Sequence, residues 1–277
     1  MPSRGRNSVF AVSSQIFLFL YTVIAIYPLL TMVTSSLKST REIFRNPFAL
    51  PEKLDLNNFS TAWDRAHFST YLTNTVVVTG VSVFVIILVG VLASYPLSRY
   101  KLRGLNMLFM FFLLGLMLPI RLGVVKLFML MRDLNLLDSL LSLILIYVAM
   151  RIPFSVFIIT NFMKTIPAEL EDAARIDGCN ELQILTRILT PLVRPAIAIV
   201  TIFSAIAIWN DFYFPFIFIY SDAAKTLPVG LASFFGQYQI NWGLLFAGLT
   251  ISTVPLSVVY LAMSRHLVRG LSVGSIK

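Results

Sequence analysis

The sequence predicts an all-α membrane protein with six transmembrane helices and with both termini in the cytoplasm. Three observations indicate this fold class: the composition, the spacing of apolar segments and the distribution of basic residues. Of the 277 residues, 57% are hydrophobic and only 13% are charged, and the mean hydropathy is +0.83. A soluble domain usually carries about 25% charged residues, so this chain is too apolar for a water-soluble fold.

Six segments are long enough to cross a bilayer, which needs roughly 20 mostly apolar residues per helix. The first follows Arg4 and Arg6 as in a signal peptide, but its apolar run reaches Met32 and exceeds the roughly 15 residues of a cleaved signal. We therefore interpret it as a retained span. The third is the least regular, because Pro119 and two cations interrupt its far end. The expected spans are residues 10–34, 71–95, 105–127, 140–162, 195–219 and 242–263.

The basic residues predict the orientation. The short loop that holds Arg99, Lys101 and Arg103 carries no acid, and the tail after Met263 also carries none. The segment 35–70 mixes cations and acids, so its charges nearly cancel. Because lysine and arginine concentrate in cytoplasmic loops, we expect the amino and carboxyl termini inside.

Other classes of function find little support in the sequence. The net charge of +9 is typical of cytoplasmic loops in a membrane protein, and no soluble domain carries a basic stripe for nucleic acid. Cys179 is the single cysteine, and His67 and His266 lie far apart outside any ligand-spaced motif, so no metal site is expected. No GxxxxGK[ST] phosphate loop occurs, so we expect any ATP to be bound by a partner.

The loop at residues 164–192 between the fourth and fifth spans has the local pattern of two helices. Pro167 suits a first helical position, and acids follow in the first turns. Gly178 stands where a left-handed cap would end the first helix, and Asn180 can cap the second. Small side chains in the first helix would let another surface approach closely. The second helix is expected to place Leu182, Leu185 and Leu189 on one face.

The same loop resembles a known motif. Asp172-Ala173-Ala174, then Gly178, then Leu189-Thr190-Pro191 are similar to the EAA loop of ABC importer permeases, and the string from Ile166 to Gly178 resembles the maltose-type carbohydrate subfamily. Segments of the first outer loop, Trp209-Asn210-Asp211-Phe212 and the tail from Arg269 extend the likeness over most of the chain. The family glutamate is Asp172 here, and Cys179 replaces a common alanine. Both departures bear on the ATPase contact.

The resemblance implies a single permease domain over residues 1–277 in a bacterial inner membrane, importing a sugar or sugar derivative. It implies a second permease subunit, two ATPase subunits that hold ATP and magnesium, and a periplasmic solute-binding protein. The chain itself would be non-catalytic and bind no cofactor. The loop would form the coupling helix that docks into an ATPase cleft. The coupling residues expected on this basis are Glu171, Asp172, Ala173, Ala174, Asp177, Gly178 and Pro191.

Polar residues in two spans are candidates for the solute path, because ionisable groups inside a membrane usually face a cavity or one another. Asn210 and Asp211 lie in the fifth span beside Trp209 and Tyr213, and this mixture suits a sugar with apolar faces and a hydroxyl rim. The alternative is an interfacial aromatic belt with a pair that fixes helix packing, and packing is the favoured interpretation.

Three cations in the spans leave further alternatives open. Arg121 and Lys126 either offer positive charge to an anionic sugar derivative or extend to the outer headgroups or a partner, and the second interpretation is favoured. Arg151 lies within the fourth span, and Asp211 is its candidate counter-ion. The competing functions are ABC import of an amino acid, osmolyte or phosphorylated polyol, an ion-coupled secondary carrier that works alone, and a membrane-embedded enzyme, for which the sequence offers no catalytic set.

Overall fold

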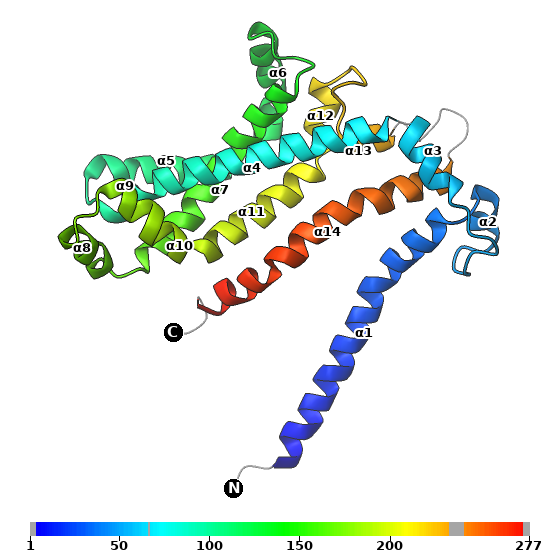
Figure 1. Ribbon diagram of the computed structural model, residues 1–277, viewed down its shortest axis with the longest axis horizontal. Coiled ribbons are helices and arrows are strands. Elements are labelled where there is room, and N and C mark those ends of the chain that lie inside the picture. Colours follow the sequence, from blue (N-terminus) through cyan, green and yellow to red (C-terminus); the bar gives the residue numbers. More distant parts are fainter. Residues whose placement is uncertain (1–3, 66, 233–240, 274–277) are drawn as a thin grey trace. The chain divides into compact units, whose positions relative to one another are not determined.

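The computed structural model describes residues 4–65, 67–232 and 241–273, and within these ranges it contains helices and no strand. Among them, four helices are long and apolar enough to cross a membrane (Figure 1). Two bent pairs of helices pass the same test together, which would bring the number of spans to six. The four are Val12–Ser36 within α1 (Arg4–Ser36), α4 (Phe68–Arg99), α7 (Leu140–Lys164) and Trp242–Ala262 within α14 (Trp242–Val273).

The third predicted span is broken. In place of one helix over residues 105–127, α5 (Arg103–Met117) is followed by the short 3-10 helix η1 (Ile120–Gly123) and by α6 (Val124–Asp133), with a bend of 81°. A proline disfavours helical backbone at the residue before it, and Leu118, which precedes Pro119, is extended at φ −74° and ψ 123°. The expectation of a continuous helix is therefore corrected.

The fifth predicted span, residues 195–219, is broken as well. Helix α11 (Arg194–Trp209) ends before Asn210, and α12 (Tyr213–Phe218) begins three residues later. Pro215 has no N–H to donate to the carbonyl of Asp211, so the helical ladder is interrupted here. At its other end α11 meets a bend of 74°, preceded by α9 (Glu181–Gln183), the π-helix η2 (Ile184–Leu189) and α10 (Thr190–Leu192).

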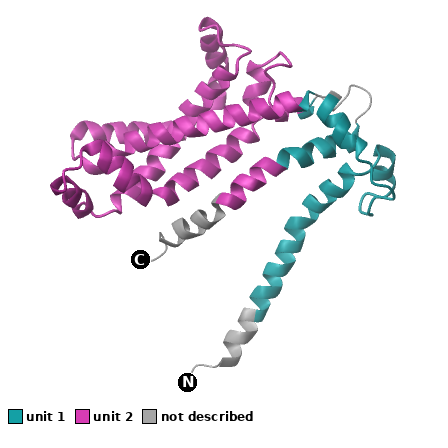
Figure 2. Ribbon diagram, in the orientation of Figure 1, with its two compact units in different colours: residues 1–68, 231–253 teal, residues 69–230, 254–277 magenta. Residues whose placement is uncertain are grey.

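The chain forms two compact units (Figure 2). Unit 1, residues 1–68 and 231–253, contains α1, α2 (Thr40–Arg45), α3 (Asn57–Arg65) and the first part of α14. Lys38 is fully buried in this unit and donates to the carbonyls of Asn46 (3.1 Å) and Ala49. Asn58 donates to the carbonyls of Ser36 (3.0 Å) and Lys38 (2.9 Å). The segment between the first two spans is thus ordered by polar side chains that satisfy main-chain acceptors.

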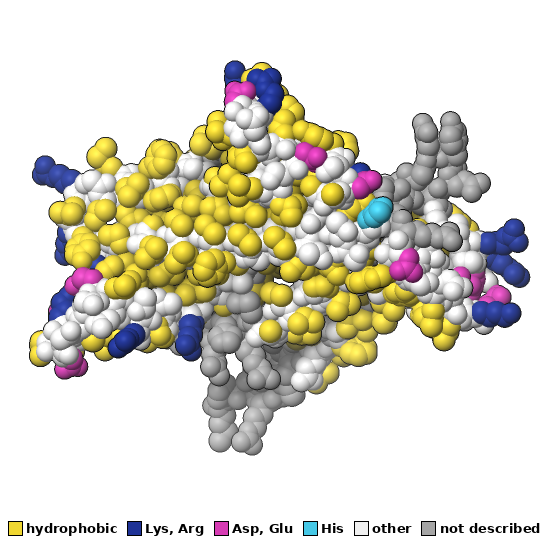
Figure 3. Space-filling view, turned by 45° about the horizontal axis from the view of Figure 1, so that its top comes forward, with side chains coloured by type: hydrophobic (Ala, Val, Ile, Leu, Met, Phe, Trp, Pro, Cys, Tyr) yellow, Lys and Arg dark blue, Asp and Glu magenta, His cyan; other side chains and the backbone are white. Residues whose placement is uncertain are grey.

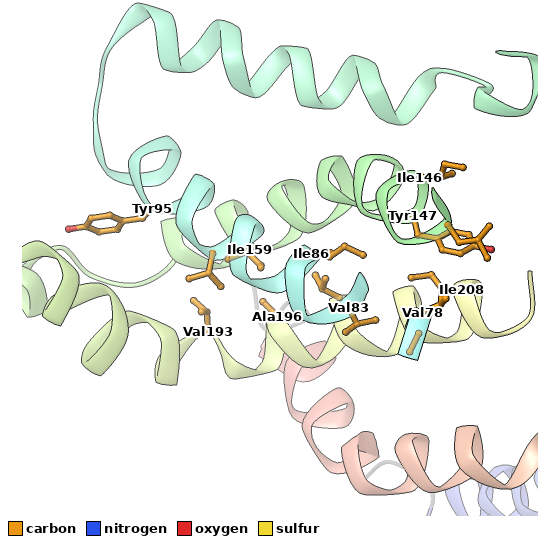
Figure 4. Packing of buried hydrophobic residues seen from close by; sticks show 14 of the residues in the cluster. Val78, Val83, Ile86, Tyr95, Ile146, Tyr147, Ile159, Val193, Ala196 and Ile208 are labelled. Atoms are coloured by element: carbon orange, nitrogen blue, oxygen red, sulfur yellow. The ribbon is translucent and has the colours of Figure 1, made fainter. Parts of the chain in front are cut away.

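Unit 2, residues 69–230 and 254–277, has its core between α4, α7 and α11 (Figure 4). Gly90 in α4 allows a close approach, because a Cβ at this position would collide with Ser155 of α7. Ser155 also donates to the carbonyl of Ile86 at 3.2 Å. Small residues at such crossings are typical of helices that associate in membranes. The core includes Val83 and Ile86 of α4, Ile146 and Ile159 of α7, and Ala196 and Ile208 of α11.

Candidate coupling segment and solute path

The coupling segment, which we define as residues 164–192, folds as a helix, a glycine turn and a second helical stretch. Helix α8 (Glu169–Ile176) ends in a turn where Gly178 has φ +85°, a left-handed conformation that favours glycine. Asn180 and Gln183 then form a capping box, each side chain accepting from the other residue's backbone N–H at 2.9 Å. The predicted glycine turn and asparagine cap are confirmed as local structure.

Two details of the segment differ from expectation. Pro167 precedes the helix, because Ala168 is the N-cap and Glu169 is the first helical residue. Leu182 is exposed, whereas Leu185 and Leu189 are buried together with Ile184. Residues 184–189 form a π-helix, whose wider turn changes which side chains share a face, so a 3.6-residue period does not describe this stretch.

Helix α8 separates the expected coupling residues onto two sides. Glu171 and Ala174 are buried, with 2% and 6% of their surfaces exposed. The side chain of Asp172 is 69% exposed and Ile176 is 88% exposed. Ala173, Asp177 and Gly178 are also exposed, and Pro191 lies half-buried in α10. The structure therefore brings Asp172, Ala173, Ile176 and Asp177 to the free surface and turns Glu171 inward.

The buried side of α8 is tied to the end of α4. Arg99, the last residue of α4, forms an ion pair with Glu171, and both side chains are largely removed from solvent, at 11% and 2% exposure. Arg99 also donates through Nη1 to the carbonyl of Ile166 at 3.2 Å. A paired, buried charge holds its position, because separating the pair would leave one charge uncompensated.

A second set of contacts connects the turn at Gly178 to the same end of α4. Arg175 contacts Asp172 at 2.9 Å and Glu181 at 3.0 Å, and the hydroxyl of Tyr95 in α4 donates to Glu181. The hydrogen bonds from Arg175 to Glu181 raise the pKa of the Arg175 guanidinium above its usual value. The two ties join α8 and the start of α9 to the end of α4.

Sequence reasoning did not identify these ties. Arg99 counted only as a cytoplasmic cation, and Tyr95 only as the last residue of the predicted second span. The two partners, Arg99 and Glu171, are separated by 72 positions, and no local pattern connects them. The sequence shows only that Arg99 is a basic residue at the end of a span and that Glu171 is an acid beside the family motif. Neither fact predicts that the two residues pair.

The predicted solute-path residues of the fifth span lie at the break after α11. Trp209 is buried at the end of α11, and Asn210 is exposed and donates to the carbonyl of Ile206 at 2.8 Å. Asp211 accepts from the hydroxyl of Tyr147 at 2.8 Å and from the N–H of Phe214 at 3.1 Å. Asp211 thus joins α7 to α12.

The proposed pairing of Asp211 with Arg151 is not an ion pair in the structure. Within the described residues no carboxylate lies within 4.0 Å of the Arg151 guanidinium, although Asp211 interacts with it electrostatically at longer range. Tyr147 takes the place that the sequence assigned to Arg151, because it lies one helical turn earlier on α7. The expected counter-ion arrangement is corrected accordingly.

The two cations of the broken third span have different surroundings. The Arg121 guanidinium lies over the ring of Tyr213, 5.3 Å from its centroid, in a cation–π arrangement. Lys126 lines a cavity of about 910 Å³ at the break between α5 and α6, and Arg151 lines the same cavity from α7. The structure therefore joins Arg121 to Tyr213 and places Lys126 with Arg151.

Comparison with known proteins gives the chain a clear affiliation. Residues 86–273 match the family described as binding-protein-dependent transport system inner membrane component. A probable ABC transporter permease, YurM of Bacillus subtilis, is 37% identical over 96% of this chain and 88% of its own length. The diacetylchitobiose uptake system permease NgcG of Streptomyces coelicolor is 33% identical over 97% and 89%.

A solved structure shares the fold. A chain of a bacterial ABC transporter involved in the import of the acidic polysaccharide alginate superposes with a TM-score of 0.82, covering 96% of this chain and 98% of that one. Its sequence is 24% identical, so the likeness concerns the fold. The likeness extends over nearly the whole length of both chains.

Proposed function

This chain belongs to the family of inner-membrane components of binding-protein-dependent transport systems, and we propose that it forms half of the translocation path of an ATP-driven saccharide importer. The chain is a multi-pass inner-membrane protein of the ABC permease class, as the motif at Asp172–Ala174 suggested. Six spans with both termini inside, counting each bent pair as one span, fit the basic loop at Arg99–Arg103.

One observation carries the proposal: one side of α8 is exposed to solvent, and the opposite side is fixed to α4 by an ion pair. Asp172, Ala173 and Ile176 stand exposed, whereas Glu171 on the opposite side is locked to Arg99 of α4. An exposed isoleucine beside a small residue and two acids suits insertion into a cleft of a partner protein. The ion pair between Arg99 and Glu171 connects the exposed face of α8 to a membrane-spanning helix. A connector that merely lies on the membrane surface would not need such a connection.

The proposed partners are those of a binding-protein-dependent ABC importer. The sequence has no phosphate-binding loop, which supports assigning ATP and magnesium to two partner ATPase subunits, whose closure would push on α8. A second permease subunit completes the path, and a periplasmic solute-binding protein delivers the solute. Movement of α8 would reach α4 through Arg99 and Tyr95, so the two helices switch together between inward- and outward-facing states.

The solute class rests on the relatives. NgcG is named for uptake of diacetylchitobiose, an oligosaccharide, and it aligns along nearly the whole of this chain. Aromatic and polar side chains meet at the break after α11, where Asn210 is exposed beside Phe212. A sugar presents apolar ring faces and a hydroxyl rim, and this combination of side chains complements both.

The test compares two exposed apolar residues of the coupling segment, Ile176 on α8 and Leu182 on α9, which are 88% and 64% exposed. The assembled transporter is purified with its ATPase subunits, and saccharide-stimulated ATP hydrolysis is measured with the binding protein present. We expect Ile176→Asp to release the ATPase subunits and abolish stimulation, and Leu182→Asp to leave both intact.

Two results would overturn the proposal. In the first, Ile176→Asp retains its ATPase subunits and its stimulated hydrolysis at the level of the unaltered complex. In the second, this chain alone moves saccharide across proteoliposomes on an ion gradient, which would make it a secondary carrier.

A further inference from the structure

The cavity at the break between α5 and α6 lies at membrane depth. It is bounded by the end of α5, by η1 and α6, and by the middle of α7. Arg151 lies 11 residues after Leu140 and 13 before Lys164, which is roughly 16 Å and 20 Å from the ends of α7 at a rise of about 1.5 Å per residue. The cavity is therefore far from both headgroup regions if α7 crosses the bilayer.

The lining combines apolar walls with positive charge. Within the part of the chain that the structure describes, the polar side chains that line the cavity are Lys126 and Arg151, and no aspartate or glutamate contributes. Neither cation forms an ion pair with a described carboxylate, and Asp211 acts on Arg151 only at longer range. The rest of the lining is apolar and includes Phe111 of α5, Leu118 and Leu122 at the break, and Met150 and Phe154 of α7.

The broken backbone and the cation at the middle of α7 both indicate that the cavity holds water. Non-helical backbone at membrane depth is tolerated only where it is buried in protein or lines a water-filled space. Leu118 and Leu122 at the break are 70% and 83% exposed, so this chain does not bury them. A cation at mid-span likewise costs several kcal/mol unless it faces a cavity or an anion. A lipid headgroup would have to sink to the depth of Arg151 to meet it.

Building on the proposed function, we propose that this cavity is an aqueous part of the translocation path and favours saccharides that carry a negative charge. The charge would be a carboxylate, sulfate or phosphate, which Lys126 of α6 and Arg151 of α7 would meet. The apolar surfaces face the ring faces of the sugar. Focusing by low-dielectric walls concentrates anions on such a site by about tenfold or more.

The experiment measures the sign of the potential inside the cavity without any need to know the solute. Leu122→Cys is introduced into a Cys179→Ala background of the whole transporter in proteoliposomes, because Leu122 lines the cavity and is exposed. The rates of modification by an anionic and a cationic methanethiosulfonate of similar size are compared. We expect the anionic reagent to be favoured, and the preference to fall about tenfold when Lys126→Gln and Arg151→Gln are added.

A matched control uses Arg132 on the same helix α6, which pairs with Asp133 at 3.0 Å and does not line the cavity. Arg132→Gln should leave the preference unchanged. Absence of labelling by either reagent would overturn the proposal by showing that lipid or a partner subunit fills the cavity. Labelling whose charge preference is the same with and without the two cations would also overturn it. Because the labelling readout needs no ATP hydrolysis, its failure is distinguishable from failure of the coupling proposal.

On the face shown in Figure 3, hydrophobic side chains cover much of the surface and most lysine and arginine side chains lie near its edges. Lys126 and Arg151 line the cavity beside the middle of α7.

Discussion

The turn at Gly178 and the break after Trp209 both interrupt helices, yet different forces shape them. At the turn, a positive φ at Gly178 and a cap at Asn180 act within three residues of each other. At the break, Asp211 is held by Tyr147, which lies 64 positions earlier in the chain. The comparison teaches that neighbours in sequence set the turn at Gly178, whereas the break after Trp209, which Pro215 favours locally, is also held by a neighbour in space.

The largest expected effect tests whether the coupling segment also needs one distant contact. Glu171→Ala would leave Arg99 buried without its partner, and breaking a buried pair in this way costs about 3–5 kcal/mol. Thermal denaturation of the purified complex in detergent measures the loss of stability. Asp172→Ala, at the adjacent exposed position, should cost less than about 1 kcal/mol.

A double substitution separates charge from packing. Arg99→Met with Glu171→Met removes both buried charges and should recover most of the stability lost in Glu171→Ala. If transport remains uncoupled in that stable variant, the ion pair transmits movement as well as holding the fold. Equal stability of Glu171→Ala and Asp172→Ala would contradict the tie between α8 and α4.

The second effect concerns the break after α11. Asp211→Ala removes an acceptor for both Tyr147 and Phe214, and a hydrogen bond to a charged group contributes about 1.5–3 kcal/mol. We expect the assembled complex to be destabilised by about this amount, whereas Asn210→Ala, at an exposed neighbour, changes stability little. Solute affinity and transport rate, measured on the assembled fraction, then distinguish roles. If transport is unchanged in both variants, Asn210 and Asp211 are packing residues and do not contact the solute.

The third effect isolates the glycine turn. Gly178→Ala meets no atom within 4 Å, so its cost comes from the positive φ alone, about 1–2 kcal/mol. Gly123→Ala has equally open space without a positive φ and should be nearly neutral. Both variants are compared by the thermal midpoint of the complex. A neutral Gly178→Ala would show that the turn is not set by local backbone preference.

The smallest effect is the helix cap. Asn180→Ala removes the side-chain acceptor for the N–H of Gln183 and should cost about 1 kcal/mol. Asn180→Asp keeps an oxygen acceptor at this position and should retain most of the stability. Protease sensitivity of the coupling segment is a suitable measurement, since fraying of α9 exposes this backbone. No difference between the alanine and aspartate variants would count against the capping box.

Much of this protein could be predicted from its residues because the relevant forces act locally or through the lipid. Six apolar stretches predicted helices, since a backbone in hydrocarbon must satisfy its own hydrogen bonds. Gly178 and Asn180 predicted the turn, because backbone conformation and capping depend on the residue itself and its next few neighbours. Pro119 marked the weak point of the third span, although its sequence did not show a bend of 81°.

The tertiary structure decided the partners of the charged residues. Glu171 belongs to Arg99, Asp211 to Tyr147, and Lys126 shares a cavity with Arg151, and each of these relations joins separate helices. The partner of a side chain depends on which helices lie side by side, and the periodicity of a sequence does not show which helices are neighbours. Local chemistry therefore specified the helices and the turn. The packing of α4 against α8, of α7 against the break before α12 and of α6 against α7 specified which charges pair and which remain available for a solute.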